Sequence, residues 1–97
     1  MSTPLSRLQA ATRHAVVEGP GSTDSVLRRQ VASGQPPLEL TTLVRTIFDH
    51  AYRLTDNDVN ALRAHYSEEQ LFELMVAAAV GASEYRLKAA LAALETA

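Results

Sequence analysis

Histidines are the residues of this 97-residue chain best suited to acid–base chemistry or metal binding. A metal site on a helix needs two ligands three or four residues apart, and His14, His50 and His65 are never that close in the sequence. The chain contains no cysteine, which excludes disulfides, thiol nucleophiles and cysteine-ligated metals. We therefore expect no metal site, no cofactor and no catalytic residues.

Carboxylates and arginines occur in pairs that favour ordinary surface roles. Glu69 and Glu73 are four residues apart and share a helix face, where we expect water to hydrate both. The basic doublet Arg28 and Arg29 lacks a glycine-rich phosphate loop, so we expect exposed, solubilising charge. Three further pairs have the four-residue spacing of weak surface ion pairs: His14 with Glu18, Asp24 with Arg28, and Glu84 with Lys88.

Length and charge restrict the classes of protein and partner. The chain has room for one domain, and its net charge of -2 argues against nucleic acid as the main partner. The longest apolar run, residues 75–82, is far shorter than the roughly 20 residues that cross a membrane. The first residues lack the order of a signal peptide. We expect a cytoplasmic protein that binds neither nucleic acid nor membrane.

Apolar spacing predicts three helices in the first half of the chain. The first is expected at about residues 4–17. A second begins with Ser22 or Thr23 as its cap and ends at Gly34, a plausible left-handed stop. The third carries apolar residues at steps of three or four from Leu40 to Leu54.

Two capping boxes predict the remaining helices. Thr55 with Asp58 opens a short helix, and Ser67 with Gln70 opens a helix over residues 68–94. The last helix contains no proline, and a kink at Gly81 is the alternative to one unbroken rod. The fold class is therefore all-α, a small bundle of about five helices ending in a long one. It forms a single domain, residues 1–97, in which 1–37 is an N-terminal helical arm and 38–97 the helical core.

The long helix is apolar around most of the circumference of its first half. A chain of this length has few other helices with which to cover that surface, so we expect a second protein surface to do so. The partner is a second copy, in a dimer or higher oligomer, or a larger protein. The predicted interface residues are Leu71, Phe72, Met75, Val76, Ala79 and Tyr85.

Residues 44–94 also carry a family resemblance. The segment Thr55-Asp56-Asn57-Asp58-Val59-Asn60-Ala61-Leu62-Arg63, the acidic start at Ser67-Glu68-Glu69 and the alanine-rich helix ending near Arg86-Leu87 follow in this order. This order resembles the C-terminal helices of the carboxymuconolactone decarboxylase and AhpD-like alkylhydroperoxidase superfamily. The resemblance implies a small all-α protein that forms dimers, trimers or hexamers. The peroxidase branch uses a Cys-x-x-Cys pair that this chain lacks, so we expect no thiol peroxidase activity.

Two hypotheses for the function follow. The first is a non-enzymatic accessory, scaffolding or oligomerisation subunit that binds itself or a protein partner. The alternative is a cysteine-free enzyme like carboxymuconolactone decarboxylase, a decarboxylase or isomerase with its pocket at a subunit junction. In that case His50 or Glu73 would be the acid–base group.

Overall fold

The computed structural model describes residues 4–96 of the chain, without the side chains of residues 4–6 and 9. Its elements are all helical, and no strand occurs within the described residues. This confirms the predicted all-α bundle with a long final helix. The helices are α1 (Pro4–Arg13), the π-helix η1 (His14–Glu18), α2 (Ser25–Ala32), the 3-10 helix η2 (Leu38–Leu40), α3 (Thr41–His50), the 3-10 helix η3 (Ala51–Arg53), α4 (Asp56–Asn60) and α5 (Glu68–Thr96).

Local capping sets the starts of three helices. The Thr55 hydroxyl accepts from the Asp58 N–H while the Asp58 carboxylate accepts from the Thr55 N–H, so the predicted capping box of α4 is confirmed. The Ser67 N–H donates to Gln70 Oε1 (2.9 Å), and the Gln70 N–H donates to Ser67 Oγ (3.1 Å), as predicted for α5. At α2 the predicted cap, Ser22 or Thr23, was wrong, because Asp24 is the cap and its side chain accepts from the N–H of Val26.

The α5 helix runs without interruption through its 29 residues. At a rise of 1.5 Å per residue this is about 44 Å, which matches the molecule's longest dimension of 45 Å. The alternative of a kink at Gly81 is therefore wrong. At Gly81 a neighbouring backbone packs directly on the helix: a β-carbon built there would overlap the carbonyl oxygen of Ala32 on α2.

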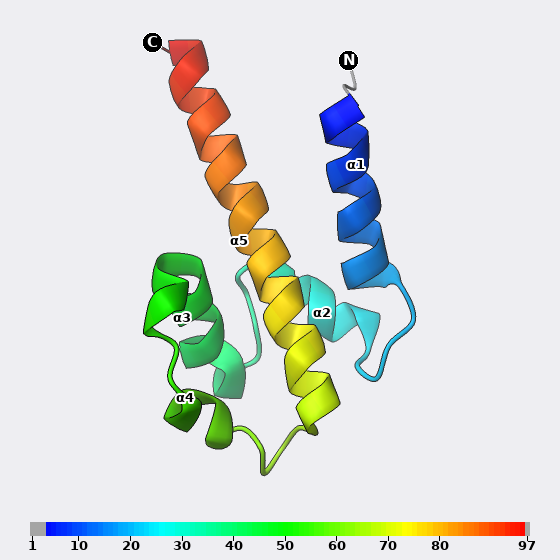
Figure 1. Cartoon of the computed structure of the whole chain (residues 1–97), viewed down its shortest axis with the longest axis vertical. Coiled ribbons are helices and arrows are strands. Elements are labelled where there is room, and N and C mark those ends of the chain that lie inside the picture. The colour runs from blue at the N-terminus through cyan, green and yellow to red at the C-terminus, as the bar shows by residue number, and fades with distance from the viewer. Residues whose placement is uncertain (1–3, 97) are drawn as a thin grey trace.

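The hydrophobic core surrounds the first half of α5. Helices α2 and α3 lie on two sides of that half (Figure 1), and small residues of α5 allow α2 to approach closely. The α2 helix contributes Val31, which is fully buried, so this part of the predicted N-terminal arm shares the core with the rest of the chain. The core cluster consists of Val31, Leu40, Leu43, Val44, Ile47, Leu62, Leu71, Leu74, Ala77 and Ala78.

The second half of α5 extends beyond this core. It and α1 project to the same side of the molecule as two separate prongs (Figure 1), and residues 88–96 are all exposed. The radius of gyration is 14.3 Å, against about 12.5 Å for a compact domain of this length. Within residues 4–96, no helix is both long and apolar enough to cross a membrane.

Candidate functional site

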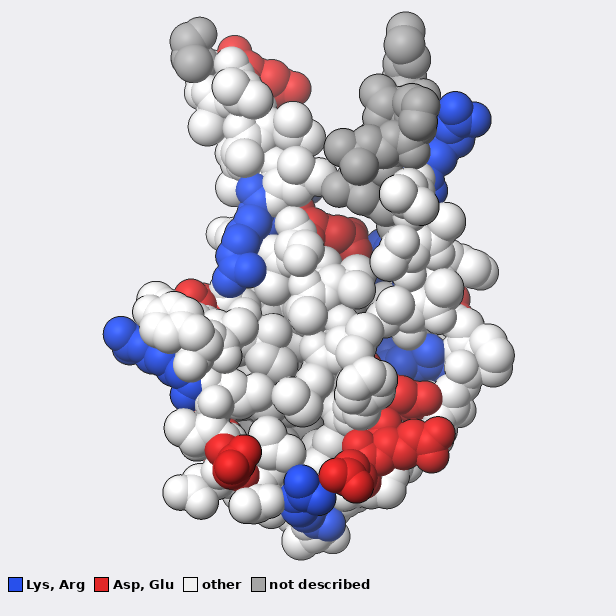
Figure 2. Space-filling model, viewed as in Figure 1, with Lys and Arg blue, Asp and Glu red and all other residues white. Residues whose placement is uncertain are grey.

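An apolar groove lies between α1 and residues 76–91 of α5. Its two adjoining hollows have volumes of about 400 and 440 Å³. Figure 2 shows uncharged surface over much of α5 and a notch between the two prongs. The first hollow is lined by Leu8, Thr12, Val76, Ala79, Val80, Ser83 and Glu84. The second is lined by Ala10, Arg13, Glu84, Tyr85, Leu87, Lys88 and Leu91.

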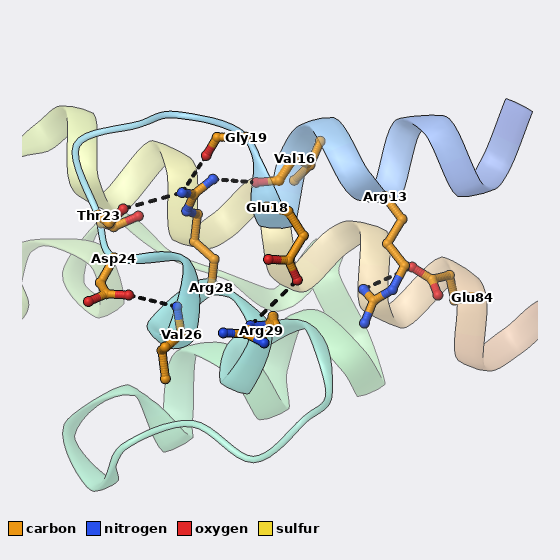
Figure 3. A network of polar contacts seen from close by, with 10 residues as sticks. All are labelled: Arg13, Val16, Glu18, Gly19, Thr23, Asp24, Val26, Arg28, Arg29 and Glu84. Carbon is orange, nitrogen blue, oxygen red and sulfur yellow. Dashed lines mark hydrogen bonds and ion pairs between the residues drawn. The ribbon is translucent and has the colours of Figure 1, made fainter.

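An ion pair crosses the groove between the two hollows. Arg13 Nη1 lies 3.5 Å from Glu84 Oε1 (Figure 3), and both atoms are buried without a hydrogen-bond partner among the described residues. The two side chains as wholes are about 40% exposed, so the pair contributes little more than a surface salt bridge. The predicted pairing of Glu84 with Lys88 is therefore wrong, because α1 brings Arg13 to the carboxylate instead.

The structure places the predicted interface residues in three environments. Phe72 and Tyr85 are 67% and 68% exposed, and Ala79 is exposed as well. Met75 and Val76 are half-buried. Leu71 is only 2% exposed, which corrects its placement on a partner-facing surface: α5 turns this side chain into the core formed with the chain's own helices.

Sequence reasoning missed the outer part of the groove. Leu91 and Leu94 are 50% and 72% exposed on α5, and Leu8 is 65% exposed on α1. The spacing of Leu87, Leu91 and Leu94, at steps of four and three, would have identified an apolar stripe on one face. The stripe faces the groove, since Leu87 and Leu91 line its second hollow.

Glu73 anchors the loop before α2 to α5. Its carboxylate accepts hydrogen bonds from the backbone N–H of Ser22 (2.7 Å) and from both the N–H (2.8 Å) and the hydroxyl (2.9 Å) of Thr23. Burial raises the pKa of Glu73, but these hydrogen bonds and the charge of Arg28 outweigh it and hold the pKa below its ordinary value. The expectation of a simply hydrated carboxylate was wrong, because the loop folds back onto it.

Arg28 closes the same loop from the other side. The residue is 4% exposed, and its guanidinium donates to the carbonyl oxygens of Val16 (2.8 Å), Gly19 (2.6 Å) and Thr23 (3.3 Å) (Figure 3). The predictions of an exposed Arg28 and of its pairing with Asp24 are wrong, because the loop carbonyls surround it.

The neighbouring Arg29 is exposed, as expected. Its Nε lies 3.4 Å from Glu18 Oε1 (Figure 3). Glu18 therefore pairs with Arg29, and not with His14 as predicted from the sequence. Both arginines therefore act on the segment that joins α1 to α2: Arg28 from inside and Arg29 at the surface. Their role in the structure is to fix the position of that connection.

Neither acid–base candidate lies in an arrangement suited to catalysis. His50 is exposed, and its Nδ1 lies 3.5 Å from the hydroxyl of the equally exposed Tyr52. Glu73 borders a hollow of about 180 Å³, but its carboxylate is occupied by the loop, and its pKa is shifted away from that of a general acid. Within residues 4–96, no three His, Cys, Asp or Glu side chains are grouped to hold a metal ion.

Comparison of the chain with protein-family models, with curated proteins and with solved structures finds no match.

Proposed function

We propose that this protein is a non-enzymatic, cytoplasmic helical subunit that associates with a second copy of itself through the groove between α1 and α5. The observation that carries the proposal is an excess of exposed surface. The accessible area is 6715 Å², whereas a folded monomer of this mass is expected to expose about 5,400 Å². The excess of about 1,300 Å² is more than the roughly 800 Å² that each partner buries in a standard interface.

Exposed apolar side chains occur on both projecting helices. Large apolar residues on the projecting parts of α1 and α5 are half to three-quarters exposed, among them Leu8, Tyr85 and Leu94. Burial of apolar area contributes about 25 cal/mol per Å², so this surface favours association. A second copy is the occupant that fits, because a two-fold axis pairs each groove with the projecting helix of the other molecule.

The family resemblance of residues 44–94 supports the same proposal. Members of the carboxymuconolactone decarboxylase and AhpD-like superfamily are small all-α proteins that form oligomers, so self-association agrees with membership. Membership itself stays a prediction. The proposed role does not depend on it, because the exposed area and the groove are properties of this chain alone.

Sedimentation equilibrium at protein concentrations from about 0.1 to about 100 μM tests the proposal. We expect a reversible dimer for the native chain. Leu91→Glu, at a half-exposed position in the groove, should raise the dissociation constant at least tenfold, because each dimer then contains two buried charges. The matched control is Leu38→Glu on η2, which alters a leucine that is 88% exposed and outside the groove.

The control variant should dimerise like the native chain. A native chain that stays monomeric across this range contradicts the proposal, and so does equal weakening by both substitutions. Circular dichroism of each variant verifies that the helices remain folded.

A further inference from the structure

The charges on the projecting half of α5 identify the orientation of the second copy. Four charged residues lie between residues 83 and 96: Glu84, Arg86, Lys88 and Glu95. Glu84 pairs with Arg13, and Arg86 donates to the carbonyl oxygen of Phe48. Lys88 and Glu95 are exposed and form no ion pair within the part of the chain that the structure describes.

Lys88 and Glu95 flank one apolar stripe. Val80, Glu84, Leu87, Leu91 and Leu94 follow one another at steps of four, three, four and three, which is the spacing of the a and d positions of a heptad. Lys88 and Glu95 each come directly after a d position, Leu87 and Leu94, and are seven residues apart. They therefore lie on the same side of the stripe.

Only one of the two possible orientations matches these charges. In a parallel pair of α5 helices, equivalent residues meet at the same level, so Glu84 would face Glu84 of the second copy, and Lys88 would be near no acidic partner. In an antiparallel pair, equivalent heptad positions on the same side of the stripe meet. Lys88 of each copy then lies beside Glu95 of the other.

The register follows from the same geometry. If Leu91 lies opposite Leu94 of the second copy, the Lys88 and Glu95 positions are about 3 Å apart along the helix axis, within reach of their long side chains. The end of the second copy's α5 then reaches the outer edge of the second hollow, where Lys88 and Leu91 line it. The C-terminal end of a helix carries partial negative charge, so the cation of Lys88 favours it there.

We propose that two copies of this chain pair through antiparallel α5 helices, with Leu91 opposite Leu94 of the second copy and two symmetric ion pairs between Lys88 and Glu95. Helix α1 of each molecule flanks the pair, which makes a four-helix arrangement across the two-fold axis. This proposal rests on the self-association proposed above and adds its orientation and register.

Charge reversal tests the register. Lys88→Glu and Glu95→Lys should each raise the dimer dissociation constant by about tenfold to thirtyfold, because two attractive pairs become repulsive. The double variant Lys88→Glu with Glu95→Lys restores both pairs with exchanged signs, and its dissociation constant should return to within threefold of the native value. Ala89→Glu is the matched control, since residue 89 is exposed and lies away from the stripe, and it should change the constant little.

The orientation has an independent test. Because the chain has no cysteine, Glu69→Cys in the first turn of α5 gives one exposed site for a fluorescent dye. In the antiparallel register the two sites are about 70 Å apart along the axis, so energy transfer between donor- and acceptor-labelled copies should be weak. Parallel helices would bring them within about 20 Å, where transfer is nearly complete.

The possible failures differ. A native chain that remains monomeric refutes self-association, and the register with it. A native dimer whose double charge-reversed variant stays as weak as the single variants refutes the register alone. Strong energy transfer in a native dimer refutes the antiparallel orientation while leaving self-association standing.

Discussion

Replacement of Gly81 by alanine tests the close packing of α5 against α2. Two effects of opposite sign compete at this position. Alanine has the higher helix propensity and would stabilise the folded chain by about 1 kcal/mol if nothing else changed. Against this, the new methyl group would overlap the carbonyl oxygen of Ala32 and lie 2.6 Å from its carbonyl carbon and 2.8 Å from its Cα.

The steric effect should be the larger one. All three of the nearest atoms belong to the backbone of Ala32, so no side chain can rotate away, and α2 as a whole must shift from Gly81. Overpacking of a well-packed core costs about 1–3 kcal/mol, and contacts with backbone atoms belong at the upper end. We expect Gly81→Ala to lower the free energy of unfolding by about 2 kcal/mol, and Tm by about 10 °C.

Urea denaturation followed by circular dichroism at a fixed protein concentration measures this change, with the concentration held constant because association also stabilises the fold. The matched control is Ser83→Ala, two residues further along the same helix at an exposed position. It should gain a few tenths of a kcal/mol from propensity. If Gly81→Ala proves as stable as the native chain or more so, the close contact with Ala32 does not exist as described.

Two further substitutions test the anchoring of the loop before α2. Arg28→Met removes the donor to three carbonyl oxygens and should cost about 2–4 kcal/mol, whereas Arg29→Met at the exposed neighbour should cost less than about 0.5 kcal/mol in the same denaturation assay. If both variants lose the same free energy of unfolding, the loop carbonyls do not hold Arg28. For Glu73, whose pKa is lowered in the folded chain, the stabilisation is present above the unfolded pKa near 4.5 and is lost as the pH falls through the folded value. Glu73→Gln should therefore reduce the decrease in the free energy of unfolding between about pH 7 and about pH 3. If the variant and the native chain lose the same stability over this range, Glu73 does not anchor the loop.

The helices were predictable because their signals are local. Ser67 and Gln70 mark the start of α5 through hydrogen bonds that span three residues, and no proline interrupts the helix that follows. The left-handed stop at Gly34, with φ 77°, is another local signal. For these elements, neighbouring residues supply both partners of the decisive contacts.

The polar contacts of the loop were not predictable in the same way. Arg28 and Glu73 look like ordinary surface charges because their spacing fits exposed helix faces. Their partners are backbone groups of the segment from Val16 to Thr23, whose path depends on the packing of α2 against α5. A helical face read from the sequence says which residues share a side, but not whether a loop will cover that side.

The division of α5 into two halves links the folding of this chain to its proposed association. Up to Ala82, small residues such as Ala77 and Ala78 allow α2 to approach, so the chain itself buries the side of the helix that faces the core. Beyond that point the apolar stripe continues to Leu94, but α1 diverges and leaves the second hollow of the groove open (Figure 1). Changes at Gly81 should therefore act on unfolding of the single chain, whereas changes at Leu91 should act on the concentration at which copies associate. These two effects should be separable only if the second half of α5 contributes little to the hydrophobic core of the single chain.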